Sequence, residues 1–238
     1  MHPLIAVIVI IFLAVMLKAV LGFGEALIAM PLLTLILGLQ TAAPLVGLMA
    51  AIITSVIAVA QWRHVDFRQT WRLVLAAAVG IPAGLVLLKI APPELMTHGM
   101  GVLLIVYGAY TLFTPNWNGL RHPAWVYVFG FSAGVLGSAY NTSGPPVVIY
   151  ATTRGWSPQQ FRATLQSCFF PMSIMIIMSH GLSGLWTPTV LLLFLLILPV
   201  IMLAFVVGNY ASQYIPTEHF ARLVRVGLCL LGIMLLIR

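Results

Sequence analysis

Long apolar stretches separated by short polar turns make up almost the whole chain. A helix that crosses a bilayer needs about 20 apolar residues, and most of the stretches approach that length. Tryptophan and tyrosine gather near their ends, where amphipathic rings prefer the membrane interface. The pattern predicts an all-α, polytopic transmembrane protein with hydrophobic segments at about 3–21, 25–38, 42–60, 70–90, 96–113, 123–139, 144–154, 160–180, 187–210 and 218–237.

Two of these segments, 25–38 and 144–154, are short. As helices they would cover roughly 15–20 Å, because each residue adds about 1.5 Å. The hydrocarbon core of a bilayer is about 30 Å thick. Each short segment also follows a glycine-containing stretch, so we expect both to be half-helices. Whether they cross the membrane or re-enter it stays open.

The composition supports the membrane interpretation. Hydrophobic residues make up 62% of the 238 residues, and charged residues only 6%, whereas soluble domains carry about 25% charged residues. The net charge of +7 therefore indicates cytoplasmic anchoring charges and no nucleic-acid partner. Cys168 and Cys229 lack metal-ligand spacing and are interpreted as packing residues. The first apolar segment is interpreted as a membrane segment, since no basic region or cleavage site accompanies it.

The distribution of Lys and Arg predicts the orientation. With the N-terminus outside, nine basic residues lie near cytoplasmic turns and two on the opposite side, which is the positive-inside bias. The cytoplasmic set is Lys18, Arg63, Arg68, Arg72, Arg121, Arg154, Arg162, Arg222 and Arg225, and the other set is Lys89 and Arg238. We therefore expect a multi-pass protein of the cell (inner) membrane with its N-terminus outside.

The chain also contains an internal repeat. Residues 20–32 match residues 135–147 at an offset of 115, which pairs Gly22 with Gly137 and Pro31 with Pro146. The stretch at 90–95 resembles the one at 214–220. We expect one transmembrane domain, 1–238, built from repeats of about 1–114 and 122–238. Five segments per repeat would place the second copy in the membrane in the opposite sense, as in many secondary transporters.

In both predicted repeats the helix break lies between the first, long segment and the second, short segment. Such transporters bind substrate where the broken helices meet, and the N-terminus of a half-helix suits an anion. The asparagine amide and the hydroxyls of the second break can donate hydrogen bonds, and its prolines suit a first helical turn. The predicted substrate-binding residues are Lys18, Gly22, Gly24, Asn141, Thr142, Ser143 and Gly144, and the predicted helix-breaking residues are Pro31, Pro145 and Pro146.

Lys18 and Glu25 are the charged candidates beside the first break. Lys18 could neutralise a bound anion, or it could extend to the cytoplasmic interface. Glu25 could carry a coupling proton, could pair with Lys18, or could be an acid favoured by the positive end of a helix. A carboxylate beside an anion site repels the substrate unless it is protonated, so we predict Glu25 as the coupling residue.

At these positions the sequence resembles the sulfite exporter TauE/SafE family of membrane permeases. Gly22, Gly24 and Pro31 match the first glycine-rich motif of that family, and Gly137, Thr142 and the Gly144-Pro145-Pro146 run match the second. The resemblance covers nearly the whole chain and implies transport, in the export direction, of sulfite or organosulfonate anions. The chain departs from the family pattern at Glu25, Ala139 and Asn141, where small residues or glycine are usual.

Other functions stay open at this stage. A proton- or cation-coupled transporter of another small solute could use Glu25, although a metal ion prefers several oxygen ligands. An intramembrane serine protease would need Ser143 and a histidine such as His180. No cofactor and no metal site are indicated, the expected partners are a small anion and the lipid bilayer, and a homo-oligomer is left open. The GIPAG run at 80–84 and the GFSAG run at 130–134 predict close helix packing.

Overall fold

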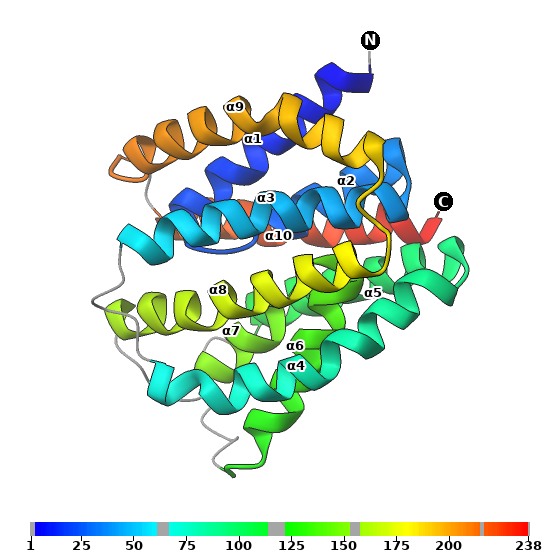
Figure 1. The fold of residues 1–238 in the computed structure, drawn as a ribbon. Helices are drawn as coiled ribbons and strands as arrows, with labels where there is room; N and C mark the ends of the chain where they lie inside the picture. The colour runs from blue at the N-terminus through cyan, green and yellow to red at the C-terminus, as the bar shows by residue number, and fades with distance from the viewer. Residues whose placement is uncertain (1–2, 61–66, 114–121, 153–157, 215–216, 238) are drawn as a thin grey trace. The chain divides into compact units, whose positions relative to one another are not determined.

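A computed structural model describes residues 3–60, 67–113, 122–152, 158–214 and 217–237, and within these ranges the chain is helical apart from short turns (Figure 1). The ten helices of these ranges lie close to the ten predicted segments. Their bounds are α1 Pro3–Leu21, α2 Glu25–Leu37, α3 Leu39–Ala60, α4 Phe67–Ile90, α5 Pro93–Phe113, α6 Trp125–Tyr140, α7 Gly144–Thr152, α8 Pro158–Leu182, α9 Pro188–Ala211 and α10 Thr217–Ile237.

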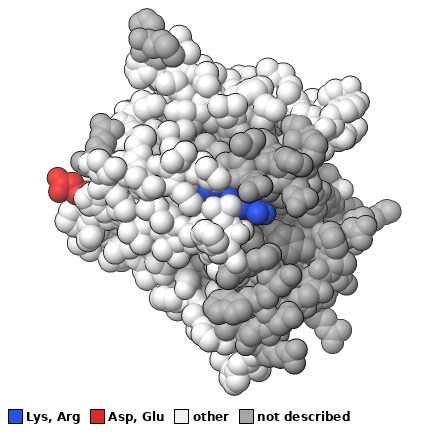
Figure 2. Space-filling model, turned by 180° about the vertical axis from the view of Figure 1, so that it is seen from behind, with Lys and Arg blue, Asp and Glu red and all other residues white. Residues whose placement is uncertain are grey.

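Six of the described helices are long and apolar enough to cross a membrane. They are α1, α3, α5, α9, the Thr70–Ile90 part of α4 and the Thr164–Leu182 part of α8. The described surface suits lipid, because α9 exposes Leu192, Leu195 and Leu203 by about 60% each. Among the described residues on the face that Figure 2 shows, charged groups appear only at isolated places. The prediction of an all-α, multi-pass membrane protein is confirmed.

The ends of the helices follow from local sequence. Thr187 precedes α9 in an extended conformation, and its side chain accepts a hydrogen bond from the backbone N–H of Val190 at 3.3 Å. Pro188 then fills the first helical position, where a missing N–H is tolerated. At the other end of a helix, Gly38 stops α2 with a positive φ of 78°, a conformation that glycine adopts without strain.

The described helices divide into two compact units. The first contains α1, α2, the part of α3 up to Val46, α5, α9 and α10. The second contains α3 from Gly47 onward together with α4, α6, α7 and α8. Each unit therefore combines helices from both predicted repeats, and a repeat by itself is not a compact unit. The predicted division into repeats of 1–114 and 122–238 stays a prediction.

In the second unit, α4 and α6 approach so closely that glycine is required at the crossing. A Cβ on Gly80 or Gly84 would lie 2.2 Å from a backbone carbonyl oxygen of α6. A Cβ on Gly134 of α6 would lie 2.1 Å from the carbonyl oxygen of Ala77. Since real Cβ atoms do not come this near to backbone atoms, the two glycine runs act as the close-packing surfaces predicted from the sequence.

The helix breaks do not align at the offset that was predicted for the repeat. α1 ends at Leu21 and α6 at Tyr140, while α2 begins at Glu25 and α7 at Gly144, so the breaks correspond at an offset of 119. The sequence match at 115 is therefore one helical turn out of register with the breaks. As a consequence, Gly137 lies inside α6, whereas its predicted counterpart Gly22 lies in the first break.

Packing inside the units repeats as well. α5 and α10 have the same length and begin 124 residues apart. A Cβ on Gly108 would lie 2.6 Å from Cys229 Sγ, and one on Gly232 would lie 2.7 Å from Ile105 Cγ1. Gly232 and Cys229 are each 124 residues after Gly108 and Ile105, so the two contacts are equivalent. A two-fold repeat produces such reciprocal pairs.

A second pair of equivalent contacts has one member in each unit. In the second unit a Cβ on Gly84 of α4 would lie 2.9 Å from the Cα of Val135 in α6. In the first unit a Cβ on Gly208 of α9 would lie 3.0 Å from the Cα of Met16 in α1. Gly208 follows Gly84 by 124 residues, and Val135 follows Met16 by 119. The fourth helix of each repeat thus packs on the first helix of the other repeat.

Candidate functional site

The first break lies in the first unit and is made by two glycines. Gly22 has a φ of 83° and Gly24 a φ of 97°, both in the left-handed region that side chains with a Cβ avoid. The backbone N–H of Gly22 closes the last turn of α1 on the carbonyl of Lys18 at 2.7 Å. The chain then turns within three residues and α2 begins at Glu25. Gly22 and Gly24 therefore form the break, and their predicted role as substrate-binding residues stays a prediction.

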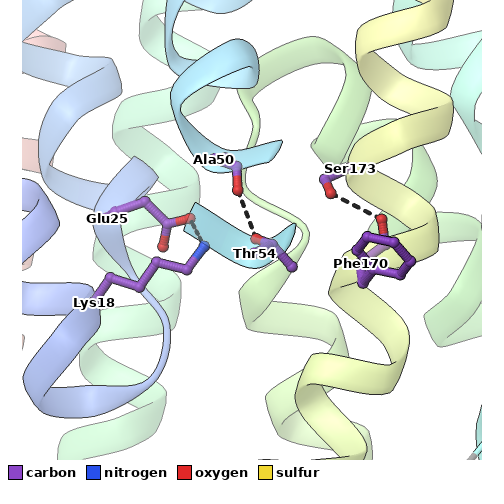
Figure 3. Close-up of polar contacts among 6 residues, drawn as sticks. All are labelled: Lys18, Glu25, Ala50, Thr54, Phe170 and Ser173. Carbon is purple, nitrogen blue, oxygen red and sulfur yellow. Dashed lines mark hydrogen bonds and ion pairs between the residues drawn. The ribbon is translucent and has the colours of Figure 1, made fainter. Parts of the chain in front are cut away.

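Lys18 and Glu25 join the two sides of this break. The ammonium group of Lys18 pairs with the carboxylate of Glu25, and their side chains are only 2% and 9% exposed (Figure 3). Of the alternatives left open by the sequence, the structure favours the pair: Lys18 is buried inside the unit and does not extend to an interface. Burial of both charges is tolerated because each compensates the other.

The second break lies in the second unit and begins with Asn141. Among the described residues, Asn141 is the one non-glycine residue with a positive φ, at 54°. Asparagine tolerates this conformation better than most residues, so Asn141 can replace the glycine usual at this point. The N–H of Thr142 reaches back to the carbonyl of Leu136 at 3.2 Å, and α7 begins two residues later at Gly144.

The three predicted helix-breaking prolines take different places. Pro145 and Pro146 occupy the first turn of α7, as predicted, and there they interrupt no helical hydrogen bond. Pro31 lies inside α2, six residues after its start, and α2 continues past it to Leu37. The break before α2 is therefore made by glycines, and Pro31 does not make it.

The prolines also change which donors the second half-helix offers. A helix start normally leaves four backbone N–H groups without helical partners. Pro145 and Pro146 carry no N–H, so in the first turn only Ser143 and Gly144 retain one. Hydrogen bonding to a ligand here would depend strongly on side chains. Thr142 and Ser143 are buried, at 2% and 8% exposure, beside this turn.

Gly137 positions the serine of the second break. A Cβ on Gly137 would lie only 2.2 Å from Ser143 Oγ and 2.8 Å from Ile176 Cδ1. The serine hydroxyl therefore rests against the backbone of the last turn of α6. Any larger residue at position 137 would displace the hydroxyl, which explains why glycine stands inside a helix at this point.

His180, near the end of α8, belongs to the second break although the sequence pattern did not place it in the site. Its ring is fully buried, and Nε2 lies 2.9 Å from the carbonyl oxygen of Ser138. That carbonyl is in the last turn of α6, where the N–H expected from Thr142 goes to Leu136 instead. His180 therefore donates from Nε2 to a helix-end carbonyl that would otherwise be unpaired.

The other ring nitrogen of His180 faces α3. A Cβ on Gly47 would lie 3.5 Å from His180 Nδ1 and 3.0 Å from Asn141 Oδ1. A side chain at Gly47 would therefore press against Asn141 Oδ1, so the asparagine and the histidine pack close to the backbone of α3 at this glycine. Nδ1 of His180 and Oγ of Ser138 are buried without a hydrogen-bond partner among the described residues. One sequence signal could have indicated His180: a histidine within an otherwise apolar membrane segment.

The two breaks differ in charge. The first carries a lysine and a carboxylate that compensate each other, and Glu25 itself occupies the positive end of α2. The second has no acidic residue in the first turn of α7, and its polar side chains are the half-buried amide of Asn141, the buried hydroxyls of Thr142 and Ser143, and the buried imidazole of His180. Within the described ranges no three His, Cys, Asp or Glu side chains gather as metal ligands.

The structure therefore brings the predicted site residues together in two groups, one in each unit. Lys18, Gly22, Gly24 and Glu25 form the first group, and residues 141–146 form the second. That the two groups meet in one site stays a prediction. Several arginines used to predict orientation lie outside the described residues or have undescribed side chains: Arg63, Arg68, Arg121, Arg154, Arg162, Arg222 and Arg238.

Comparison with known families agrees with the motifs at both breaks. The profile described as sulfite exporter TauE/SafE matches residues 7–235, which is nearly the whole chain and includes both breaks and all ten helices in whole or in large part. Comparisons with curated proteins and with solved structures returned no match. The resemblance found in the sequence is confirmed: the chain belongs to the sulfite exporter TauE/SafE family of membrane transporters.

Proposed function

We propose that the protein is a permease that exports small sulfur-containing anions, of the sulfite or organosulfonate type, across the cell (inner) membrane. Family membership supports the transport of sulfur anions. The observation that carries the proposal is the second break, where the amide of Asn141 and the hydroxyl of Ser143 lie beside the N-terminal end of α7, while the Thr142 hydroxyl donates to the Leu136 carbonyl oxygen at 3.4 Å. Neutral donors and a helix N-terminus suit an anion of low charge.

Alternating access between the two inverted repeats is the mechanism that we propose for the movement. The reciprocal pairs Gly108 with Cys229 and Gly232 with Ile105 support a two-fold repeat. In transporters of this architecture, broken helices of both repeats line the site near the midplane of the membrane. The proposal therefore includes Gly22 and the first break as well as the second, with the N-terminus outside as the charge distribution predicts.

Glu25 remains the coupling residue predicted from the sequence. Its ion pair with Lys18 would link protonation of the carboxylate to anion binding. If Glu25 takes up a proton, Lys18 loses its compensating charge inside the protein. A bound anion would restore the balance, since an isolated buried charge is strongly unfavourable. Proton uptake at Glu25 and anion binding would then favour each other.

The alternative enzyme would use Ser143 with His180 as its base. The structure gives no support to that pairing among the described hydrogen bonds, because Nε2 of His180 meets the Ser138 carbonyl and Nδ1 faces Gly47. The cation alternative relies on Glu25, whose carboxylate already pairs with Lys18. Neither alternative is favoured by a specific contact.

The test is uptake of labelled sulfite, thiosulfate and methanesulfonate into proteoliposomes, with and without a pH gradient. We expect saturable uptake of at least one anion, and its loss in Asn141→Gly, which keeps the backbone conformation and removes the amide. Asn209→Gly is the matched control, because Asn209 is exposed near the end of α9. Absence of uptake of all three anions by folded wild-type protein would refute the proposal.

A further inference from the structure

The ion pair at the first break contains the buried charges of the described structure. Among the charged side chains that the structure describes, only Lys18 and Glu25 are buried, and they pair with each other (Figure 3). The other described charged side chains are exposed or half-buried: Arg72, Lys89, Glu94 and Arg225. The charge that the described interior presents to a ligand therefore depends on whether Glu25 is ionised.

The second break has no equivalent of this pair. The helix bounds align the two breaks at an offset of 119, and the residues directly after α1 and α6 then correspond, both with a positive φ. The same offset pairs Lys18 with Gly137 and Glu25 with Gly144. Since glycine carries no side chain, the two breaks together supply a single lysine and a single carboxylate.

The pair can present a ligand with one of two charge states. With Glu25 ionised, its charge cancels that of Lys18 and the pair is neutral. When Glu25 takes up one proton from solvent, it becomes a neutral carboxylic acid and the positive charge of Lys18 is uncompensated. A singly charged anion then restores neutrality, whereas a doubly charged anion leaves one negative charge buried. A buried charge without a partner is strongly unfavourable.

We propose that the Lys18–Glu25 pair selects singly charged anions, so that the permease accepts bisulfite and alkylsulfonates and rejects sulfate, thiosulfate and the sulfite dianion. Each bound anion is accompanied by one proton on Glu25. This inference rests on the proposed function and deepens it, because it names the charge of the substrate and the number of coupled protons. It makes Lys18 and Glu25 specificity-determining residues.

Few other described groups around the pair could take up that proton. The helices of the first unit that pack against α1 and α2 are α5, α9 and α10. Their described carboxylate is Glu94, which is exposed at the start of α5. Their other described titratable or basic side chains are His98, Tyr107 and Tyr110 of α5, Tyr210 of α9, and Arg225 and Cys229 of α10. Within the described residues, Glu25 is therefore the one buried carboxylate.

Methanesulfonate and sulfate are matched probes, because both are tetrahedral anions of similar size and they differ by one charge. Full-length protein in detergent is titrated with each, and with sulfite and thiosulfate, in buffers of different ionisation enthalpy; the calorimetric heats then report the protons taken up on binding. We expect methanesulfonate to bind at least about a hundredfold more tightly than sulfate. Each bound methanesulfonate should bring one proton, and its affinity should fall about tenfold per pH unit where Glu25 is ionised in the free protein.

Glu25→Gln separates the lysine charge from the proton. The positive charge of Lys18 then has no carboxylate to cancel it, so methanesulfonate should bind without proton uptake and with an affinity that does not change with pH. Because the anion replaces the missing carboxylate, it should raise the melting temperature of this variant by more than that of the wild type, a comparison that stays possible if the variant is unstable. Glu94→Gln, which changes an exposed carboxylate of the same unit, is the matched control and should behave as the wild type.

The outcomes are distinct. Sulfate binding as tight as that of methanesulfonate would overturn the inference, and so would proton uptake that persists in Glu25→Gln; the permease proposal would survive either result. If wild-type protein binds none of the anions, the proposed function fails and the inference fails with it. A purely structural pair would make Glu25→Gln less stable while leaving the proton stoichiometry and the anion preference unchanged, which would also overturn the inference.

Discussion

The crossing of α4 and α6 makes Gly134→Ala a sharp test of the structure. The added Cβ would lie 2.1 Å from the carbonyl oxygen of Ala77 and 2.8 Å from its carbon and Cα. These are backbone atoms in the middle of a helix, so no side-chain rotation can relieve the contact. To bring the closest approach to 3.0 Å, the helices must separate by about 0.9 Å. Gly80 and Gly84 hold the same crossing from the α4 side.

The expected magnitude combines two opposing terms. Overpacking by one methyl group destabilises a tight interior by roughly 1–3 kcal/mol, and a contact with rigid backbone belongs at the upper end. Alanine gains about 1 kcal/mol over glycine in a helix interior. We therefore expect Gly134→Ala to destabilise the protein by about 2 kcal/mol, which corresponds to roughly 4–8 °C in melting temperature for a chain of this size.

The assay is thermal unfolding of detergent-solubilised protein, followed by the loss of the monodisperse peak after heating. Gly227→Ala is the matched control, because a Cβ there meets nothing within 4 Å. That variant should melt at the wild-type temperature or a little above it. If Gly134→Ala were as stable as Gly227→Ala, the close approach of α4 and α6 would be refuted, and with it the packing role of both glycine runs.

Three further predictions concern the breaks. Lys18→Met and Glu25→Gln should each lower the free energy of unfolding by roughly 3–5 kcal/mol, because either change leaves one buried charge without its partner. The double variant should recover most of this loss. An additive loss in the double variant would contradict the pairing. Asn141→Gly should keep the wild-type melting temperature, whereas Asn141→Val should lose about 1–2 kcal/mol or more, because valine avoids the left-handed conformation. Gly137→Ala should reduce anion uptake by displacing Ser143, and the double variant Gly137→Ala with Ser143→Ala should regain the stability lost but not the uptake.

The sequence predicted most of the fold because its strongest signals are lengths of apolar chain. All ten segments appear as helices, and α1 has the predicted bounds of 3–21. The register predicted for the repeat was wrong, because the sequence identities align at an offset of 115 residues whereas the helix breaks align at an offset of 119 residues. Four residues make about one helical turn, so the two alignments place similar residues on the same helix face.

The site was predictable only where residues adjoin in sequence. Asn141, Thr142 and Ser143 stand next to a proline pair, and this local pattern indicates a helix start. His180 is 42 residues after Ser138, and its bond to that carbonyl depends on how α8 packs against α6. Gly47 lies still further away, on α3. Its contact with Asn141 and His180 is visible only from what a Cβ would meet there, which no spacing along the chain reveals.

The two copies of the predicted repeat are alike in their helix crossings and differ in the chemistry of their breaks. Equivalent glycines, such as Gly84 and Gly208, still form the helix crossings, because backbone proximity tolerates no other residue. The breaks are less constrained, since any residue that accepts a positive φ preserves the turn. Glycine does so in the first break and Asn141 in the second. A charged pair in one break and a polar cluster in the other are therefore both compatible with the same scaffold. In the function that we propose, the first break would supply charge balance and the second would supply hydrogen bonds to the anion.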